Sequence, residues 1–292
     1  MSSAISGLFL LDKPAGISSF SALGSLKRNL GTGKVGHAGT LDPFATGLLL
    51  ALSGKLTRSV SLLSDMDKEY EAVFRFGEET DTLDTEGNVI AEAPVPEYSS
   101  IQKSVVVFSG TITQIPPAFS AIKINGKRAY SSARKGLDVE MPERQVQIRS
   151  FELLNWNPPD LGVKIRCSKG TYIRSVARDL GLESGSRAFC RSLRRTAIGP
   201  FSVDNALPPE TIKQNNGLLP VDFFQSIGVC VKTVPLDIAG RLRQGFPVSR
   251  LSIPLSSEDR LTLFTDDNGI PAALMELKNE KLHYSIVFDN FS

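Results

Sequence analysis

The stretch "GHAGTLDPFATG", residues 36–47, decides how the first part of the chain is interpreted. It places His37 and Asp42 among glycines, directly before Pro43 and an apolar run. Asp followed by Pro is a typical helix start, so the pattern predicts a buried helix over residues 43–54 with Asp42 as its N-cap, worth roughly 0.5–2 kcal/mol. A helix dipole would also keep Asp42 ionised, as a nucleophile or base requires. The cap and the reactive carboxylate are compatible interpretations, and both stay open.

Composition indicates an ordinary globular protein of 292 residues, 41% apolar and 22% charged, long enough for one large and one small domain. The net charge is only +2, so any site for a polyanion must come from local clustering. Three cysteines without close pairs fit a reducing cytoplasm. We see no signal peptide and no apolar run near the ~18 residues of a membrane helix. A cytoplasmic protein is therefore expected.

Periodicity in the first part of the chain predicts alternating strands and helices. Residues 7–14 form a short buried strand, and residues 18–31 an amphipathic helix that starts at a serine and ends at a glycine. A glycine-rich loop over 31–39 and an alternating strand over 69–77 follow. Residues 65–97 are acidic and should lie away from any nucleic acid.

The second part of the chain predicts a strand, a tight turn at Gly170 and a helix over residues 162–181. Turn signals in residues 116–140 predict a protruding hairpin or mobile loop. The composition changes at residues 216–235, and a helix-like piece and short strand patterns follow. A small β-rich C-terminal domain is expected there.

Basic residues cluster between positions 123 and 195. The cluster consists of Lys123, Lys127, Arg128, Arg134, Lys135, Lys164, Arg166, Lys169, Arg174, Arg178, Arg187, Arg191, Arg194 and Arg195. Its C-terminal part faces only Asp179 and Glu183 as local acids. This segregation predicts a basic face that follows a phosphate backbone. The aromatic residues between them, Phe119, Tyr130, Tyr172 and Phe189, would suit unstacked bases of a folded RNA.

Several other chemistries are disfavoured by the sequence. It has only two histidines, His37 and His283, and no CxxC or HxxH spacing, so no metal site is expected. "GTGKVGH" lacks the glycine and the Ser or Thr of a phosphate loop, and no GxGxxG or GxSxG occurs after a strand. Cys167 lies on an apolar alternating stretch, which favours a core thiol over a nucleophile.

Seven stretches, in order along residues 8–225, resemble the motifs of the TruB family of tRNA pseudouridine synthases. They are "LLDKPAGISS", "GHAGTLDPFATGLLLALSGKLTR", "DKEYEA", "TDTLDTEG", "IPPAFSAIKINGKRAY", "CSKGTYIRSVARDLG" and "RSLRRTAIGPF". Several long motifs in the right order make this resemblance specific.

The resemblance implies an α+β protein with the pseudouridine synthase fold, a large mixed and mainly antiparallel sheet flanked by helices. The catalytic domain would span residues 1–228, with an RNA-binding thumb at 116–140. Residues 229–292 look loosely like a PUA-type RNA-binding domain. The implied activity is the isomerisation of uridine to pseudouridine at position 55 in the T loop of tRNA. The partner would be the tRNA T-arm, with no cofactor, no metal and no membrane, and a monomer is expected.

The resemblance also implies roles for single residues. Asp42 matches the catalytic aspartate, Tyr70 the tyrosine that stacks on the target base, and Arg174 the arginine that pairs with the aspartate. Leu193 matches a residue that packs in the active-site pocket, and His37 matches the histidine that helps hold the everted T loop. Lys123, Lys127 and Arg128 lie in the matched thumb. Tyr172, from the basic and aromatic pattern, is a further candidate for an RNA contact. Lys13 and Pro14 match a motif that supports the catalytic loop.

The chemistry leaves alternatives open. An ionised Asp42 could add to the sugar carbon, or act as a base while a glycal forms. Arg174 would keep it charged, and Tyr70 could relay the C5 proton, although a phenol with a pKa near 10 is a poor base. Rival interpretations are an RNA-binding protein without catalysis, a synthase for another RNA, and a glycoside hydrolase. The hydrolase is disfavoured because no second carboxylate lies near Asp42 in sequence.

Overall fold

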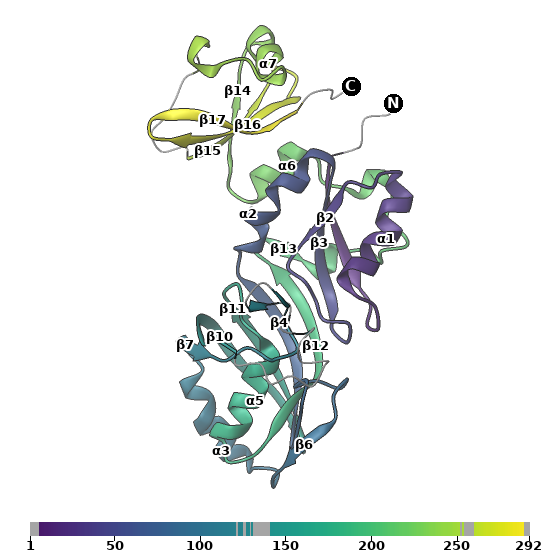
Figure 1. Ribbon diagram of the computed structural model, residues 1–292, viewed down its shortest axis with the longest axis vertical. Coiled ribbons are helices and arrows are strands. Elements are labelled where there is room, and N and C mark those ends of the chain that lie inside the picture. The colour runs from purple at the N-terminus through teal and green to yellow at the C-terminus, as the bar shows by residue number, and fades with distance from the viewer. Residues whose placement is uncertain are drawn as a thin grey trace.

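The protein is elongated, with a large sheet in its middle and lower part and a small sheet at the upper end (Figure 1). The computed structural model describes residues 6–120, 122–124, 127–128, 130, 141–251, 253 and 260–288. Across these residues, we find no helix with the length and hydrophobicity needed to cross a membrane.

The large sheet has nine strands and is mainly antiparallel. Seven strands follow the spatial order β1 (Leu8–Lys13), β3 (Thr46–Ser53), β12 (Ala188–Ile198), β4 (Lys68–Phe76), β11 (Asp160–Cys167), β10 (Arg144–Asn157) and β7 (Gly110–Gln114). Two further strands pair at its side, β2 (Val35–Ala38) with β3 and β13 (Phe201–Ser202) with β12. Among the described strands of this sheet, β3 and β12 are the only neighbours that run parallel. The predicted fold class, a large mixed and mainly antiparallel sheet with flanking helices, is confirmed.

The helix predicted over residues 43–54 is wrong, because this segment forms strand β3. Leu48 and Leu50 pack into one core, and Leu49 and Ala51 pack into another core on the opposite face, beneath α1 (Ser19–Leu30). A strand buried on both faces has a continuous apolar sequence, which periodicity alone does not separate from a buried helix. No helix follows Asp42, so the helix-cap interpretation is wrong as well.

Other predictions for the first part of the chain hold. Helix α1 begins after Ser18, whose side chain accepts a hydrogen bond from the Ser21 N–H, and ends at Gly31 in the left-handed conformation. Strands β1 and β4 lie where alternation predicts them. The predicted loop over residues 31–39 is shorter than expected, because its second half forms β2.

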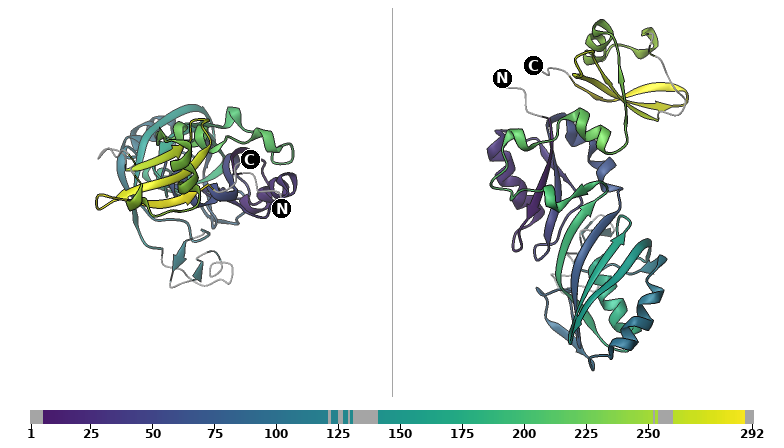
Figure 2. Two further views of the ribbon diagram at one scale, coloured as in Figure 1. Left: turned by 90° about the horizontal axis from the view of Figure 1, so that it is seen from above. Right: turned by 180° about the vertical axis from the view of Figure 1, so that it is seen from behind.

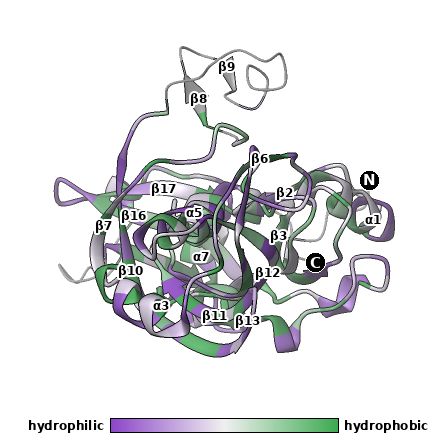
Figure 3. Ribbon diagram, turned by 90° about the horizontal axis from the view of Figure 1, so that it is seen from below, coloured by the Kyte–Doolittle hydropathy of each residue, from purple (hydrophilic) through white to green (hydrophobic). Residues whose placement is uncertain are grey.

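Helices α3 (Tyr98–Ser104) and α5 (Ile173–Glu183) lie on one face of the lower half of the sheet (Figure 1). They share its core, where Ile101 of α3 and Val176 of α5 pack with Phe74 of β4. In Figure 3 hydrophobic residues concentrate along the central strands and hydrophilic residues along the peripheral loops. Short elements complete this region: η1 (Gly54–Ser59), α2 (Val60–Ser64), η2 (Val105–Val107), η3 (Val203–Asn205) and η4 (Gln214–Asn216).

Two small hairpins extend from the large sheet. Strands β5 (Glu78–Thr80) and β6 (Val89–Glu92) form one, and β8 (Lys123–Ile124) and β9 (Lys127–Arg128) form the other. The second hairpin projects from the body of the protein, as the view from above in Figure 2 shows. It lies within the predicted hairpin over 116–140, most of which falls outside the described residues.

The C-terminal part forms a separate four-stranded sheet, as predicted. It follows α6 (Pro220–Ser226) and contains β14 (Cys230–Thr233), α7 (Leu236–Arg243), η5 (Val248–Arg250), β15 (Leu261–Thr265), β16 (Pro271–Lys278) and β17 (Lys281–Val287). Leu263 and Leu274 belong to the same buried cluster as Phe223 and Phe224 of α6. The likeness to a PUA-type domain and the division between residues 228 and 229 stay predictions.

Gly47 is expected to be essential for stability. Its φ is +100°, and an added Cβ would lie 2.3 Å from the carbonyl oxygen of Arg195, on the parallel neighbour β12. Gly47→Ala should therefore lower the free energy of unfolding by at least about 2 kcal/mol. The matched control is Gly36→Ala in β2, where the nearest heavy atom would be 3.7 Å away and a change within about 1 kcal/mol is expected. Urea denaturation measures both; equal losses would contradict this role of Gly47.

Candidate active site

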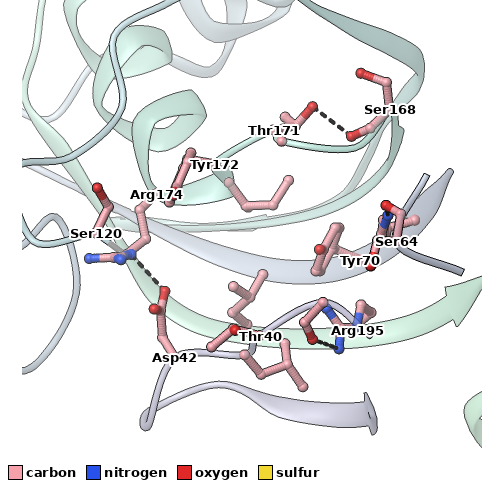
Figure 4. Close-up of a pocket in the computed structure, with 16 residues that line it drawn as sticks. Thr40, Asp42, Ser64, Tyr70, Ser120, Ser168, Thr171, Tyr172, Arg174 and Arg195 are labelled. Carbon is pink, nitrogen blue, oxygen red and sulfur yellow. Dashed lines mark hydrogen bonds and ion pairs between the residues drawn. The ribbon is translucent and has the colours of Figure 1, made fainter. Parts of the chain in front are cut away.

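A cavity of about 300 Å³ opens where β4 and β12 meet the loop before β3 and the start of α5 (Figure 4). Its volume is at the lower end of the roughly 300–1,000 Å³ typical of small-molecule sites. Five residues that the sequence singled out line it: Asp42, Tyr70, Tyr172, Arg174 and Leu193. The fold thus brings together residues from four separate segments: the loop before β3, β4, the start of α5 and β12.

Asp42 lies in the loop between β2 and β3, and α1 holds that loop in place. The Leu41 N–H donates to Oγ of Ser19 over 2.8 Å, and the Ser19 hydroxyl donates back to the Leu41 carbonyl over 3.0 Å. Gly39, with φ +74°, makes the turn that starts the loop. Both contacts fix the backbone directly before Asp42.

Lys13 lies beneath the same loop. Its side chain is fully buried, and Nζ donates to the carbonyl oxygens of Pro14, Ile17 and Pro43 over 2.8, 2.8 and 3.3 Å. Burial lowers the pKa of Lys13 to about 8, and the charge of Asp42 opposes that shift. The ammonium therefore ties the end of β1 to the residue after Asp42. This geometry suits the support that the resemblance implies for Lys13 and Pro14.

Arg174 is buried at the start of α5, and its guanidinium contacts Asp42. Nε lies 2.9 Å from Oδ2 of Asp42, but its N–H is not directed at an acceptor, so the contact is an ion pair rather than an aligned hydrogen bond. The two terminal nitrogens are better placed. Nη1 donates to Oδ2 of Asp84 over 3.0 Å and to the Thr82 carbonyl over 2.7 Å, and Nη2 donates to the Phe119 carbonyl over 3.0 Å.

Asp84 is a second carboxylate at the site that sequence reasoning missed. Its side chain is only 4% exposed, and it accepts hydrogen bonds from the Thr82 hydroxyl and the Glu86 N–H over 2.6 and 3.0 Å. The acidic stretch over 65–97 was expected to lie away from any nucleic acid, yet it supplies this carboxylate. The motif "TDTLDTEG" contains Asp84 and was the one available signal. Asp84 is distant from Asp42 in sequence, and the fold brings it to the site through Arg174.

Burial raises the pKa of the Asp42 carboxyl above its ordinary value of 3.8, while the Arg174 guanidinium acts to lower it and Asp84 raises it further. About a third of the Asp42 side chain remains exposed, but it faces a concave cavity, where the surrounding protein still displaces much of the water. Arg174 favours the ionised form, as expected. Burial nevertheless outweighs the effect of Arg174, so the pKa of Asp42 lies above 3.8.

Tyr70 projects from β4, the strand that alternation predicts over residues 69–77. It is 9% exposed, and burial raises the pKa of its phenol above the usual 10.0, although the charge of Arg195 opposes this shift. Tyr70 therefore carries its proton at neutral pH, which disfavours the proposed proton relay through it.

The predicted basic face carries less uncompensated charge than the sequence suggests, because seven of its fourteen members form ion pairs, all but Arg178 with acids that are distant in sequence. The pairs are Lys164–Glu69, Lys169–Asp65, Arg174–Asp42, Arg174–Asp84, Arg178–Asp179, Arg187–Glu79, Arg191–Asp160 and Arg194–Asp12. Arg166 is exposed, and Arg195 is only 1% exposed. Arg195 lines the cavity and was missed as a site residue, since sequence gave no sign that it was buried.

The other predicted contact residues lie around the site to different degrees. Leu193 is buried in the cavity wall, and the Tyr172 ring lies below the Arg144 guanidinium, 5.4 Å from ring centroid to carbon. His37, on β2, is half-buried and is not part of the cavity wall; burial lowers its pKa. The side chains of Lys123, Lys127 and Arg128 fall outside the described residues.

Two further features bear on chemistry. Within the described ranges, no three His, Cys, Asp or Glu side chains gather as a metal site would require. Cys167 is 1% exposed on β11, and burial raises the pKa of its thiol to about 11. The prediction of a core thiol is confirmed.

Comparison with known proteins agrees with this geometry. Residues 27–173 match the model of the TruB family pseudouridylate synthase (N terminal domain). The tRNA pseudouridine synthase B of Bordetella parapertussis is 45% identical over 214 residues, which cover 72% of this chain and 88% of that protein. The protein of the same name from Azoarcus sp. is 41% identical over 246 residues, 82% of each chain.

Solved structures share the fold at lower identity. A chain in the crystal structure of a Cbf5-Nop10-Gar1 complex matches with a TM-score of 0.66 and 22% identity, over 97% of this chain and 84% of that chain. This likeness concerns the fold alone. The family match and the identity to curated relatives go further: the chain belongs to the TruB family of pseudouridylate synthases.

Proposed function

We propose that this enzyme isomerises uridine to pseudouridine in the T loop of tRNA, at position 55. Relatives that are 41–48% identical carry the name tRNA pseudouridine synthase B, which supports tRNA as the substrate. The observation that carries the proposal is the Asp42 carboxylate, 2.9 Å from the Arg174 guanidinium, in a cavity large enough for one nucleoside.

A uridine in a folded T loop must leave its stack before it can enter this cavity. Such extrusion costs a few kcal/mol. Stacking on an aromatic ring returns roughly 1–3 kcal/mol per base. Tyr70, which lines the cavity and retains its proton, is the ring proposed to stack on the extruded base.

The reaction breaks the bond between N1 and C1′, turns the base and rejoins it through C5. It has no net redox change and no group donor, so it requires no cofactor. Asp42 adds to C1′ as a nucleophile, or removes a sugar proton while a glycal forms; both routes need the ionised carboxylate. Arg174 orients this carboxylate and favours its charge, and Lys13 holds the backbone that follows it.

RNA contacts are proposed for His37 and for the thumb residues Lys123, Lys127 and Arg128, which the resemblance places against the T-arm. An RNA contact is also proposed for Tyr172, on the basis of the basic and aromatic pattern around it. The small C-terminal sheet is proposed to act as a PUA-like RNA-binding domain, and the enzyme to work as a monomer in the cytoplasm. An RNA-binding protein without catalysis would use the same surfaces. Only a chemical assay separates that rival from the enzyme.

The decisive assay uses a T-arm hairpin whose uridines carry tritium at C5, in the presence of EDTA. Isomerisation releases tritium to water, whereas RNA binding or glycoside hydrolysis does not. The wild type should release one tritium per target uridine. Asp42→Asn should bind the hairpin with unchanged affinity and release none, because the amide can neither attack C1′ nor accept a proton. Release by Asp42→Asn at the wild-type rate would sink the assignment.

Arg174→Ala is expected to lower the single-turnover rate about 100-fold or more, because breaking a buried pair of this kind costs roughly 3–5 kcal/mol. Arg174→Lys should retain part of the activity, since it keeps the charge but loses the fork that contacts two carboxylates. The control is Arg75→Ala on β4, whose guanidinium pairs with Asp160 outside the cavity wall. Unchanged rates in both Arg174 variants would contradict this role.

Activity should fall on acidification at a pH above the ordinary aspartate pKa of 3.8, because burial raises the pKa of Asp42 and the protonated acid is inactive. Arg174 acts to lower that pKa, so Arg174→Lys, with a less closely held charge, should move the acid limb to higher pH. The measurement is kcat/KM between pH 4 and 8, with thermal unfolding at each pH as the control. An acid limb unaffected by the substitution would show that another group titrates.

A further inference from the structure

Arg195 is the largest of the fully buried side chains among the described residues. In the described part of the chain, no carboxylate lies within ion-pair distance of its guanidinium, whereas Arg174 contacts two. A buried cation without a counter-charge destabilises a protein, and such groups tend to mark function. Lys68 shares this condition: it is 7% exposed and lines the same cavity, and burial and the charge of Arg195 lower its pKa to about 8.

Backbone carbonyls hold the Arg195 guanidinium in one position. Nε donates to the Leu48 carbonyl over 2.8 Å, and Nη2 donates to the Gly39 carbonyl over 2.9 Å. A Cβ at Gly39 would lie 3.3 Å from Nη1, so the glycine leaves room for this approach. Arg195 pairs in register with Tyr70 on β4. Figure 4 shows Arg195 and Tyr70 at one end of the cavity, and Asp42 and Arg174 at the other.

Arg195 lies beside Tyr70 on the neighbouring strand, and its charge acts to lower the phenol pKa, against the larger effect of burial. A guanidinium has only donors, so a phenol oxygen beside it can only accept. The phenol keeps its own hydrogen, since burial holds its pKa above the usual 10.0. That hydrogen is therefore available to a ligand, and the neighbouring positive charge polarises it. Both groups present positive partial charge to whatever occupies this end of the cavity.

The proposed reaction places negative charge there. When the N1–C1′ bond breaks, its electron pair stays on N1 and spreads over the O2 and O4 atoms of the uracil ring. The sugar carbon is left to Asp42 at the other end. The ring then turns, C5 bonds to C1′, the C5 proton leaves to water, and N1 takes up a proton. Charge thus appears on the base in the first step and is gone at the end.

We infer that Arg195, acting with the Tyr70 phenol, stabilises the negative charge on the departing uracil ring. The inference rests on the proposed function and adds a second catalytic group to it, at the end of the cavity opposite Asp42. A fixed donor aimed at developing charge typically contributes 10²–10³-fold to the rate. This role also accounts for the burial of the Arg195 cation, which has no carboxylate within ion-pair distance among the described residues.

The test compares Arg195→Met with wild type on two T-arm hairpins, one with uridine and one with 5-fluorouridine at the target. Fluorine withdraws electrons and makes the ring a better leaving group. Its departure therefore depends less on stabilisation of the negative charge by Arg195. We expect Arg195→Met to lower the single-turnover rate about 100-fold with uridine, and to lower the rate with 5-fluorouridine by a factor at least threefold smaller. The rate measured is that of forming the bond between C5 and C1′; the product from 5-fluorouridine keeps its fluorine, because its C5 has no proton to lose. Binding affinity for each hairpin should stay unchanged.

Controls separate this role from a structural one. Arg75→Met removes an ion-paired guanidinium from β4 and should leave both rates unchanged. Arg195→Lys keeps the charge and should recover part of the rate with uridine. In a Tyr70→Phe background, Arg195→Met should cost less than in the wild type, because the two groups act together. Equal losses on both hairpins, or a loss confined to affinity as a phosphate contact would give, would overturn the inference.

The experiment distinguishes a failure of the proposed function from a failure of the inference about Arg195. If the wild type converts neither hairpin, the proposed function fails. If the wild type converts both and the Arg195 variants lose activity equally on both, only this inference fails. Should no Arg195 variant fold, the wild type is tested with 2-thio- and 4-thiouridine at the target, since sulfur accepts hydrogen bonds weakly. One of the two should react more slowly than uridine, and equal rates for all three would refute the inference.

Discussion

The Arg174 guanidinium between Asp42 and Asp84 is the contact on which the architecture of the site depends. It joins the start of α5 to three segments that are remote in sequence: the loop before β3, the turn before β6 and the chain near Phe119. A buried cation between two carboxylates leaves the cluster with one net negative charge. Arg174 therefore does more than pair with Asp42, because it also holds the walls that keep water from it.

The part of the sheet where β3 and β12 meet contributes both to stability and to the candidate active site. Strands β3 and β12 run parallel at Gly47 and Arg195, and the close approach there needs a residue without a side chain. The Arg195 backbone passes Gly47, while its side chain turns back to the carbonyls of Leu48 and Gly39. The loop that carries Asp42 is thus enclosed between α1, Lys13 and Arg195. A shift of these strands would move both ends of the cavity at once.

Sequence patterns predicted the elements that have one buried face and failed for those with two. Strand β4 and helices α1 and α5 show clear periods because solvent lies on one side of each. Strand β3 has cores on both sides, so its apolar run carried no period and was taken for a helix. Asp42 was nonetheless identified, since the residues around it matched a family motif. Asp84 lies in one of the matched motifs, but its pairing with Arg174 across 90 residues could not be read from the sequence. Arg195 was missed because its burial leaves no mark in a single sequence.

The distribution of charge in the folded protein was also hard to predict from the sequence. Between residues 164 and 195 the sequence is strongly basic, but seven of its nine cations meet carboxylates across the sheet or within α5. Of the other two, Arg166 is exposed and Arg195 lines the cavity. Each ion pair has little net charge, so the pairs add little to the electric field far from this segment. Salt screens the remaining field of exposed charges within about 10 Å. What survives is a cavity with a carboxylate at one end and an uncompensated guanidinium at the other. Such a field acts on a base and its sugar in opposite senses, which is the separation of charge that breaking a glycosidic bond requires.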